Sequence, residues 1–319
     1  LINRRLKSMA PLKENNTQTK NQSIRQKLFL GTAILFLTVG IAASLLDFKS
    51  TLTAFSQIPA VTLGVIFLLG SVSWLLRGLR TWIVFQEFSL LEALGISFLH
   101  NTANNLAPMR LGELALPALA RWLAGIKFSV GLTSLIWIRF LDLISLLGIG
   151  FCILLLPSLG SIMLACLAIL VFATPMIISH LIPKIQNLPL PKSIENARTQ
   201  LIFEAKQGKR LHRIWRLTIL AWLTKLIAMA ILLGSLAGLP ITEVMGTILG
   251  AELSSILPIH GLAGAGSYEA GGALGASLAG QSPLAGLELA IQLHLYVLSL
   301  TLLFGILGGL LLLKRTIHG

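Results

Sequence analysis

Long apolar runs alternate with short polar connections along most of the chain. A helix needs about 20 consecutive apolar residues to cross a bilayer, whereas the core of a signal peptide has only about 7–15. Six runs are long enough and carry few charges: 28–46, 59–85, 130–156, 159–182, 214–239 and 283–313. This pattern predicts an all-α, polytopic membrane helical bundle with about six full spans, of which the first is uncleaved.

Two further apolar segments, 90–125 and 241–280, are broken near their centres by proline and polar residues. Each has an apolar approach, a proline, a glycine turn, a glutamate and then small helix-forming residues. Pro108 and Pro258 stand 150 residues apart in a chain of 319, which resembles a duplication. In a six-span chain the two segments enter from opposite sides, so we expect two re-entrant broken helices arranged as an inverted repeat.

Such broken segments have two explanations. Backbone that leaves helical geometry survives at membrane depth only where it is buried in protein or lines a water-filled cavity. Interrupted helices at corresponding positions of two halves are the best sequence indication of a transporter's substrate site. The alternative is a pair of loosely packed loops at the membrane surface. We favour the cavity.

The composition excludes several classes of protein. Hydrophobic residues make up 55% of the chain and charged residues only 12%, about half the charged fraction of a soluble domain. An ordinary soluble enzyme and a disordered protein are therefore excluded. The long apolar runs also argue against a transmembrane β-barrel, because the strands of a barrel alternate between apolar and polar residues.

The basic excess has a topological explanation. The chain has 25 Lys and Arg against 12 Asp and Glu, a formal net charge of +13, which by itself could indicate a nucleic-acid partner. On the six-span topology, however, only Lys49 falls in an outer loop, and this is the distribution that the positive-inside rule describes. We therefore expect a multi-pass protein of the cell (inner) membrane with both termini cytoplasmic and no nucleic-acid partner.

We expect a single transmembrane domain at 28–313, with a basic, disordered cytoplasmic tail at 1–27 and a short cytoplasmic end at 314–319. No Ser-His-Asp order, HExxH motif or CxxC pair stands out, and no segment outside the predicted spans is long enough for a catalytic domain. Cys152 and Cys166 lie in apolar runs without metal-ligand spacing. The expectation is a protein without enzyme activity, cofactor or metal.

Arg139 and Asp142 lie in the middle of the run 130–156. Their i, i+3 spacing places them on one face of a helix. Each charge costs ~2.5–3.5 kcal/mol at the centre of a membrane helix, so such residues are seldom kept without a role. Either the two side chains satisfy each other and fix helix packing, or Arg139 meets an anionic headgroup. The two readings are compatible.

Glu113 and Glu269 occupy equivalent places in the two broken segments. A carboxylate in the first turn of a half-helix can simply cap that helix. Beside a cavity, the two glutamates also become candidates for proton coupling or for holding a gate. Arg110 lies three residues before Glu113, a spacing that predicts an internal ion pair.

The glycine-rich stretch that begins at His260 opens a helix, with Gly264 and Gly266 in the turn. Exposed N–H groups at such a helix start form an anion site, assisted by the helix dipole. The alternative is close helix packing, which Gly271 and Gly275 support through their GxxxG spacing.

The last predicted span carries a polar stripe within roughly 80° on a helical wheel: Glu288, Gln292, Tyr296 and Ser299. A polar stripe in an apolar helix should face the bundle or a cavity. His294 lies off this stripe, and we expect it to be a packed residue. Lys225 is buried within the run 214–239, yet its side chain is long enough to extend toward the inner membrane surface.

These motifs resemble those of the lysylphosphatidylglycerol synthase transmembrane family, also called the flippase-like domain family. An Asn-Asn pair followed by P-x-R-x-G-E is found at Asn104, Asn105, Pro108, Arg110, Gly112 and Glu113. The R-x-x-D pair of the next helix is similar to Arg139 and Asp142. The late L-P…G-x-G-x-x-E element is similar to Leu257, Pro258, Gly264, Gly266 and Glu269, and Arg77 and Arg80 fit an Arg-rich end of the second span. The resemblance covers about residues 30–313.

The sequence departs from the family pattern in two places. Leu116 and Pro117 stand where many members have an Arg after the first glutamate, and Leu262, Ala263 and Gly264 stand where many have Pro-Gly-Gly. The aminoacyl-transfer domain of the full-length synthetases has no counterpart in this sequence. The resemblance therefore does not imply the synthesis of an aminoacyl lipid.

The resemblance implies a stand-alone protein that moves or presents an anionic lipid, a phospholipid or polyprenyl phosphate, between leaflets. A homo-oligomer is compatible with it. The expected substrate-binding residues combine the motifs with the polar stripe: Asn104, Asn105, Arg110, Glu113, Arg139, Asp142, His260, Gly264, Gly266, Glu269, Glu288 and Gln292. One alternative is a non-catalytic membrane partner of a lipid-linked glycosyl- or acyltransferase, docked through the basic segment 184–216. The weakest alternative is a lipid-modifying enzyme that uses Glu113 or Glu269 as a base.

Overall fold

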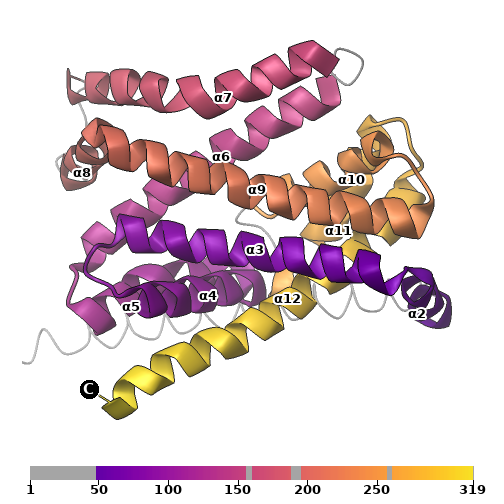
Figure 1. The fold of residues 1–319 in the computed structure, drawn as a ribbon, viewed down its shortest axis with the longest axis horizontal. Coiled ribbons are helices and arrows are strands. Elements are labelled where there is room, and N and C mark those ends of the chain that lie inside the picture. The colour runs from indigo at the N-terminus through magenta and orange to yellow at the C-terminus, as the bar shows by residue number, and fades with distance from the viewer. Residues whose placement is uncertain (1–47, 156–159, 188–194, 257–260, 319) are drawn as a thin grey trace, which may run out of the picture.

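The computed structural model describes residues 48–155, 160–187, 195–256 and 261–318, which form helices and turns without any strand (Figure 1). Five helices in these ranges are long and apolar enough to cross a membrane: α3 (Ala60–Val84), α6 (Phe128–Leu155), α7 (Gly160–Leu181), α9 (Gly208–Ala237) and α12 (Pro283–His318). They correspond to five of the six predicted spans. The predicted first span, 28–46, and the tail before it lie outside the described residues.

The long helices run alternately in opposite directions, and polar contacts fix their pairing (Figure 1). At the start of α9, Arg210 donates to the backbone carbonyls of Ile83 and Val84 at the end of α3, over 3.1 and 2.6 Å. The last carbonyls of a helix have no partner within the helix, so this side chain satisfies them. Further along the same pair, Ser73 donates to the carbonyl of Ala221 over 2.7 Å. The two helices therefore pack antiparallel.

The first broken segment is a helical hairpin. Helix α4 (Leu90–Leu106) begins with a capping box between Ser89 and Glu92. After it comes a 3-10 turn, η1 (Pro108–Leu114), in which Met109 and Arg110 have left-handed backbone with φ of 52° and 56°. Helix α5 (Ala115–Ala124) then returns alongside α4. Proline lacks the N–H that would continue α4, so the break follows directly from Pro108.

The second broken segment is also a hairpin, made of α10 (Ile241–Ser254), the turn η4 (Leu262–Gly264) and α11 (Ser267–Leu278). Gly246 and Gly250 on α10 face Gly271 and Gly275 on α11 so closely that backbone meets backbone. Small residues allow this approach in membrane helices. The packing explanation for Gly271 and Gly275 is therefore confirmed.

The turns of the two hairpins meet inside the bundle. Arg110 of η1 donates to the backbone carbonyl of Ile256, at the end of α10, and η1 contacts η4. In Figure 1 the α4–α5 hairpin enters from the end where α3 stops, and the α10–α11 hairpin enters from the opposite end. Loose loops at the membrane surface do not describe this arrangement.

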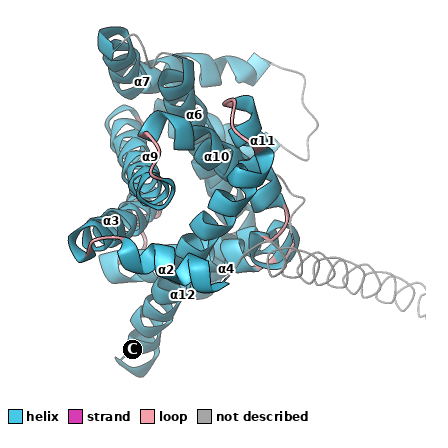
Figure 2. Cartoon of the chain, turned by 90° about the vertical axis from the view of Figure 1, so that its right-hand side faces the viewer, coloured by secondary structure: helices cyan, strands magenta, loops and turns pink. Residues whose placement is uncertain are grey.

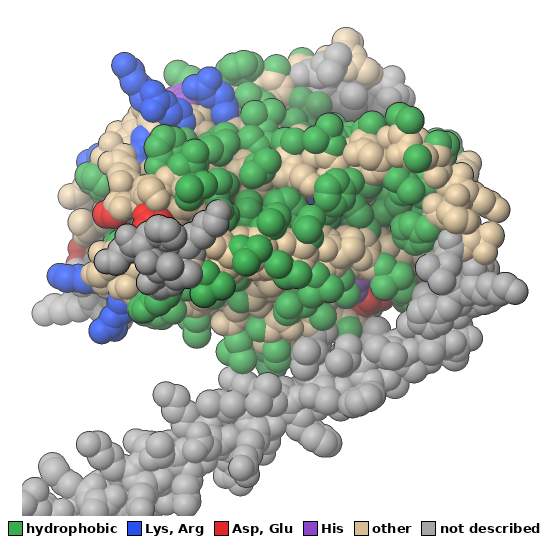
Figure 3. Space-filling view, turned by 60° about the horizontal axis from the view of Figure 1, so that its bottom comes forward, with side chains coloured by type: hydrophobic (Ala, Val, Ile, Leu, Met, Phe, Trp, Pro, Cys, Tyr) green, Lys and Arg blue, Asp and Glu red, His purple; other side chains and the backbone are tan. Residues whose placement is uncertain are grey.

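Two shorter helices were not predicted: α2 (Phe48–Gln57) and α8 (Glu195–Lys206), the second in a segment expected to be a loop. Helix α7 lies at the outer edge of the bundle, beside α6 and α9 (Figures 1 and 2). Figure 3 shows a broad apolar surface with Lys and Arg gathered at one end. Exposed bases on the helix ends at this side include Arg121, Lys127, Lys206, Lys209 and Arg213.

The glycine contact in the second hairpin can be tested by adding one methyl group. In Gly275→Ala the new Cβ would overlap the backbone carbonyl of Gly246, and overpacking of this kind costs about 1–3 kcal/mol. We expect a lower melting temperature for the purified protein. Gly64→Ala is the matched control, because a Cβ at Gly64 of α3 meets nothing within 4 Å. Equal melting temperatures for Gly275→Ala and the native protein would contradict this packing.

Candidate functional site

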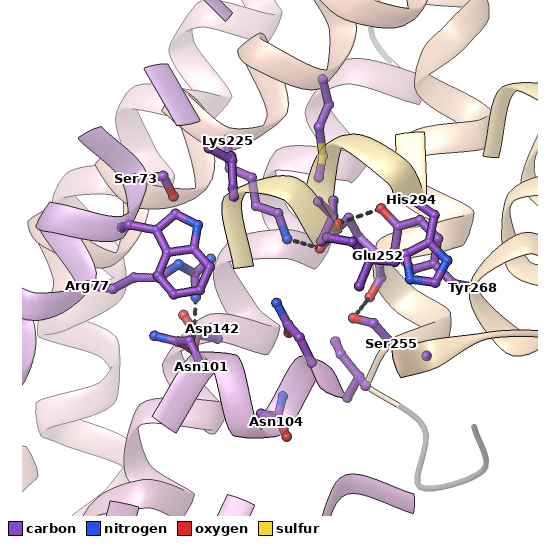
Figure 4. Close-up of a pocket in the computed structure, with 18 of the residues that line it drawn as sticks. Ser73, Arg77, Asn101, Asn104, Asp142, Lys225, Glu252, Ser255, Tyr268 and His294 are labelled. Carbon is purple, nitrogen blue, oxygen red and sulfur yellow. Dashed lines mark hydrogen bonds and ion pairs between the residues drawn. The ribbon is translucent and has the colours of Figure 1, made fainter. Parts of the chain in front are cut away.

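A cavity of about 250 Å³ lies where the two hairpin turns meet (Figure 4). Its walls come from both hairpins and from α3, α6, α9 and α12. Seven of the predicted site residues line it: Asn104, Asn105, Arg110, Glu113, Arg139, Asp142 and Gly264. The lining is partly charged and partly apolar, and the charged side chains form three groups.

The first group is centred on Asp142, which is only 4% exposed. Arg80 donates to both carboxylate oxygens, over 2.7 and 3.3 Å, and Trp222 donates to Oδ1 over 3.0 Å. Arg77 and Arg139 lie 4.0 and 3.8 Å from Oδ2. One buried carboxylate thus faces three guanidinium groups, and the expected pairing of Arg139 with Asp142 is only one of these contacts.

The second group is centred on Glu113. Its carboxylate accepts a hydrogen bond from Arg110 of the same turn and pairs with Arg139 Nε at 2.9 Å. Asn104 fits between them when its amide donates to Glu113 over 3.1 Å and accepts from Arg139 Nη2 over 3.2 Å. The predicted pair of Arg110 and Glu113 is therefore present. Glu113 does not cap α5, whose first turn has no side-chain cap.

Arg77 differs from the other arginines of the cavity. Among the described residues none accepts a hydrogen bond from its guanidinium within normal distance, and its contact with Asp142 is a long one of 4.0 Å. Its Cζ atom lies 4.9 Å from the centre of the Trp222 ring, and Lys225 Nζ lies 5.2 Å from the same ring. A face of Trp222 thus stabilises positive charge through the ring quadrupole while leaving the Arg77 N–H groups available.

The third group lies on the opposite wall, as Figure 4 shows. Lys225 of α9 pairs with Glu252 of α10 at 2.6 Å, and the Tyr268 hydroxyl donates to the other oxygen of Glu252 over 3.0 Å. Glu252 is 1% exposed. Lys225 therefore does not extend toward the membrane surface, because a buried carboxylate holds its ammonium group inside the bundle.

Glu269 and His294 are joined next to this wall. His294 Nδ1 lies 2.5 Å from Glu269 Oε1, and His294 Nε2 lies 2.7 Å from the carbonyl oxygen of Ala263. The other oxygen of Glu269 accepts from the N–H of Gly266 over 2.7 Å. The capping explanation for Glu269 therefore holds, and it occupies the N–H group of Gly266 that the predicted anion site requires. His294 is packed, as expected, and both of its ring nitrogens also make polar contacts.

The remaining predicted residues lie away from the cavity or outside the described part of the chain. Gly266 and Glu269 stand behind the cavity wall, Gln292 is buried outside the lining, and Glu288 is exposed. Asn105 lines the cavity but donates to Thr301 of α12 over 2.8 Å. His260 lies outside the described residues. Of the polar stripe on α12, Tyr296 lines the cavity and Gln292 is buried, whereas Glu288 and Ser299 are exposed. The prediction that the stripe faces the bundle or a cavity therefore holds for two of its four residues.

The substrate-binding residues predicted from the sequence did not include several residues that line the cavity: Arg77, Trp222, Lys225, Glu252, Tyr268 and His294. Three of them carried a usable signal. Arg77, Lys225 and Glu252 are charges in apolar segments, the same observation that singled out Arg139. Trp222 and Tyr268 carried none, because an aromatic residue in a membrane helix is most often part of its packing.

The Lys225–Glu252 pair predicts a measurable loss of stability. Lys225→Met would leave Glu252 buried with only the Tyr268 hydroxyl, and breaking a buried pair costs about 3–5 kcal/mol. We expect a strongly lowered melting temperature that the double variant Lys225→Met/Glu252→Gln largely restores. The control is Glu195→Gln, which breaks the partly exposed pair with Arg198 on α8 and should cost at most about 1 kcal/mol. A Lys225→Met melting temperature equal to that of the control would contradict the buried pair.

Comparison with known proteins gives one match. Residues 28–305 match the lysylphosphatidylglycerol synthase TM region. No curated protein and no solved structure matches the chain. The matched range includes both hairpins and most of the five apolar helices, so the protein is a multi-pass membrane protein. Because the match covers well over half of the chain, the protein belongs to the lysylphosphatidylglycerol synthase TM region family.

Proposed function

We propose that this protein moves an anionic lipid between membrane leaflets by holding its phosphate-bearing headgroup in the central cavity. Membership of the family indicates a lipid-related membrane role, and the charge of the cavity supports the finer statement. Arg77, Arg80, Arg110, Arg139 and Lys225 stand against three carboxylates, those of Glu113, Asp142 and Glu252. The five bases outnumber the three acids by two, so the cavity carries an excess of two positive charges.

Unbalanced charge inside a membrane protein is costly unless an opposite charge accompanies it. An anionic headgroup supplies that charge. Arg77 and Arg139 are the residues best placed to meet it. Arg77 has no hydrogen-bond acceptor among the described residues, and the side chain of Arg139 is 28% exposed, more than those of Arg77, Arg110, Asp142 or Glu113. A guanidinium binds two phosphate oxygens at once, which suits a phosphate monoester or diester.

The apolar part of the lining suits the rest of a lipid. It includes Trp74 of α3, Met229 of α9, Ile256 after α10, and Val297 and Leu300 of α12. A charged wall next to an apolar wall matches an amphipathic molecule better than a small hydrophilic anion. A phospholipid and a polyprenyl phosphate share this chemistry, and the assay below distinguishes them.

Two hairpins that enter from opposite ends also suit alternating access. We propose that they are the halves of an inverted repeat and that each opens the cavity toward its own side of the membrane, as in other transporters built from broken helices. The end that carries the exposed bases would face the cytoplasm by the positive-inside rule. The driving force would be a gradient or downhill exchange.

Lipid transfer can be measured in vesicles that contain the purified protein. We expect accelerated transfer of labelled phosphatidylglycerol or polyprenyl phosphate between leaflets. Arg139→Ala should slow it by roughly 10–100-fold, because hydrogen bonds to charged groups contribute about 1.5–3 kcal/mol. The variant should still fold, since Glu113 remains paired with Arg110 and Asp142 remains paired with Arg80.

The matched control is Arg121→Ala, an exposed arginine at the end of α5 and outside the cavity. It should transfer lipid at the native rate. Labelled lipids without net charge should move more slowly than anionic ones. If no anionic lipid is accelerated, or if Arg139→Ala equals the native protein, the proposal fails. A stable complex with a transferase in the absence of transfer would instead favour the role of a membrane partner.

A further inference from the structure

We infer that Glu269 and His294 form a buried proton-binding site that joins the second hairpin to α12. Their side chains are 7% and 9% exposed. One ring nitrogen of His294 faces the Glu269 carboxyl group at 2.5 Å, and the other faces the carbonyl oxygen of Ala263 at 2.7 Å. One neighbour of the ring is thus a backbone carbonyl, which can only accept, and the other is a carboxyl group, which when ionised can only accept.

Counting the hydrogen-bond donors in these two contacts shows that the pair of Glu269 and His294 needs one extra proton. A neutral imidazole has one N–H group, an ionised carboxylate has none, and a backbone carbonyl has none. Two contacts between acceptors at these distances need two protons. The pair therefore carries one proton more than a neutral histidine beside a carboxylate. That proton is held either by the imidazole, as an imidazolium–carboxylate pair, or by the carboxyl group, and in both cases the pair has no net charge.

The surrounding groups do not supply this proton. On α11, Tyr268 packs with its ring centre 4.7 Å from that of His294, but its hydroxyl donates to Glu252 of α10. Lys225 of α9 is paired with the same Glu252. The other charged or titratable groups around the cavity are engaged elsewhere or face Trp222. Those of α3, α4, η1 and α6 are Arg77, Arg80, His100, Arg110, Glu113, Arg139 and Asp142. On α12 itself, the Tyr296 hydroxyl donates to the backbone carbonyl of Ile66 over 3.1 Å. The N–H of Gly266 reaches only Oε2 of Glu269.

The proton has a mechanical consequence. Ala263 belongs to the turn of the second hairpin and has left-handed backbone, with φ of 57°, while His294 belongs to α12. Without the extra proton, two lone pairs would face each other in one of the two contacts, and the turn would lose an attachment to α12. Ala263, Gly264 and His294 all line the cavity, so the proton controls one of its walls.

The proton also changes the charge that a headgroup meets. When it leaves, the pair becomes negative and offsets part of the positive excess of the cavity. An anionic headgroup should therefore bind the protonated cavity more tightly, and the proton and the headgroup should move together. This coupling rests on the proposed lipid transfer, whereas the proton site itself does not.

The proton site can be tested without any transport. The purified full chain in lipid nanodiscs, with ¹⁵N-labelled histidine, is measured at about pH 7, where an ordinary histidine is mostly neutral and an ordinary glutamate is ionised. We expect either two protonated ring nitrogens at His294 by NMR or a protonated carboxyl band in the infrared spectrum. The ring-nitrogen signals are assigned to His294 by their loss in His294→Gln, and the carboxyl band is assigned to Glu269 by its loss in Glu269→Gln. A neutral His294 beside an ionised Glu269 would overturn the inference.

Glu288→Gln is the matched control, because Glu288 is an exposed carboxylate six residues before His294 on the same helix. It should leave both spectroscopic signatures unchanged. If His294→Gln does not fold, Glu269→Gln provides the second variant, since it changes the His294 signal through their contact. An unchanged His294 signal in Glu269→Gln would also overturn the shared proton.

Coupling is tested separately in vesicles with an imposed pH gradient and labelled phosphatidylglycerol. A gradient of one pH unit should shift the distribution between leaflets by up to about tenfold if one proton moves with each lipid. The shift should be lost in Glu269→Gln. If the distribution of the labelled lipid between leaflets does not change with the pH gradient in the native protein, the coupling is overturned but the proton site is not. If no lipid moves while the spectroscopic signature is present, the proposed function fails and the proton site stands.

Discussion

The arrangement of this protein depends on the cost of holding charge where water is scarce. Seven Arg, Lys, Asp and Glu side chains that line the cavity lie on apolar helices or on the breaks between them: Arg77, Arg110, Glu113, Arg139, Asp142, Lys225 and Glu252. Each acid among them has a base within contact distance. Isolated, any of these charges would oppose insertion of its helix. Their ion pairs require α3, α6, α9, α10 and η1 to assemble in one way. The charged groups therefore specify which helices pack together, which apolar surfaces alone would not do.

Helix α12 connects these groups to the two hairpins. Its Thr301 accepts hydrogen bonds from Thr102 and Asn105 of α4, over 3.1 and 2.8 Å, and its His294 holds the turn of the second hairpin. Its Tyr296 hydroxyl donates to the backbone of α3 over 3.1 Å. One span thus contacts both broken segments and the wall that carries Arg77.

Much of the architecture follows from local pattern. The apolar runs located the five described spans to within a few residues, except at the start of α9 and the end of α12, and the prolines and glycines located both hairpins. Arg110 with Glu113 is close in sequence and was predicted as a pair. The failures have a common cause. A helical wheel describes one helix, so it placed Glu288 toward the bundle and left His294 aside, although the neighbours of α12 determine which side is inward.

The sequence by itself determined an all-helical membrane protein with two broken segments, because hydrophobic length and helix-breaking residues act within a few turns of chain. Only the tertiary structure decided which charges meet. Arg80 and Asp142 are 62 residues apart, Lys225 and Glu252 are 27 apart, and Ala263 and His294 are 31 apart. Contacts between different helices depend on how those helices rotate and cross. That geometry arises from the packing of the whole bundle and not from the spacing of residues along one segment.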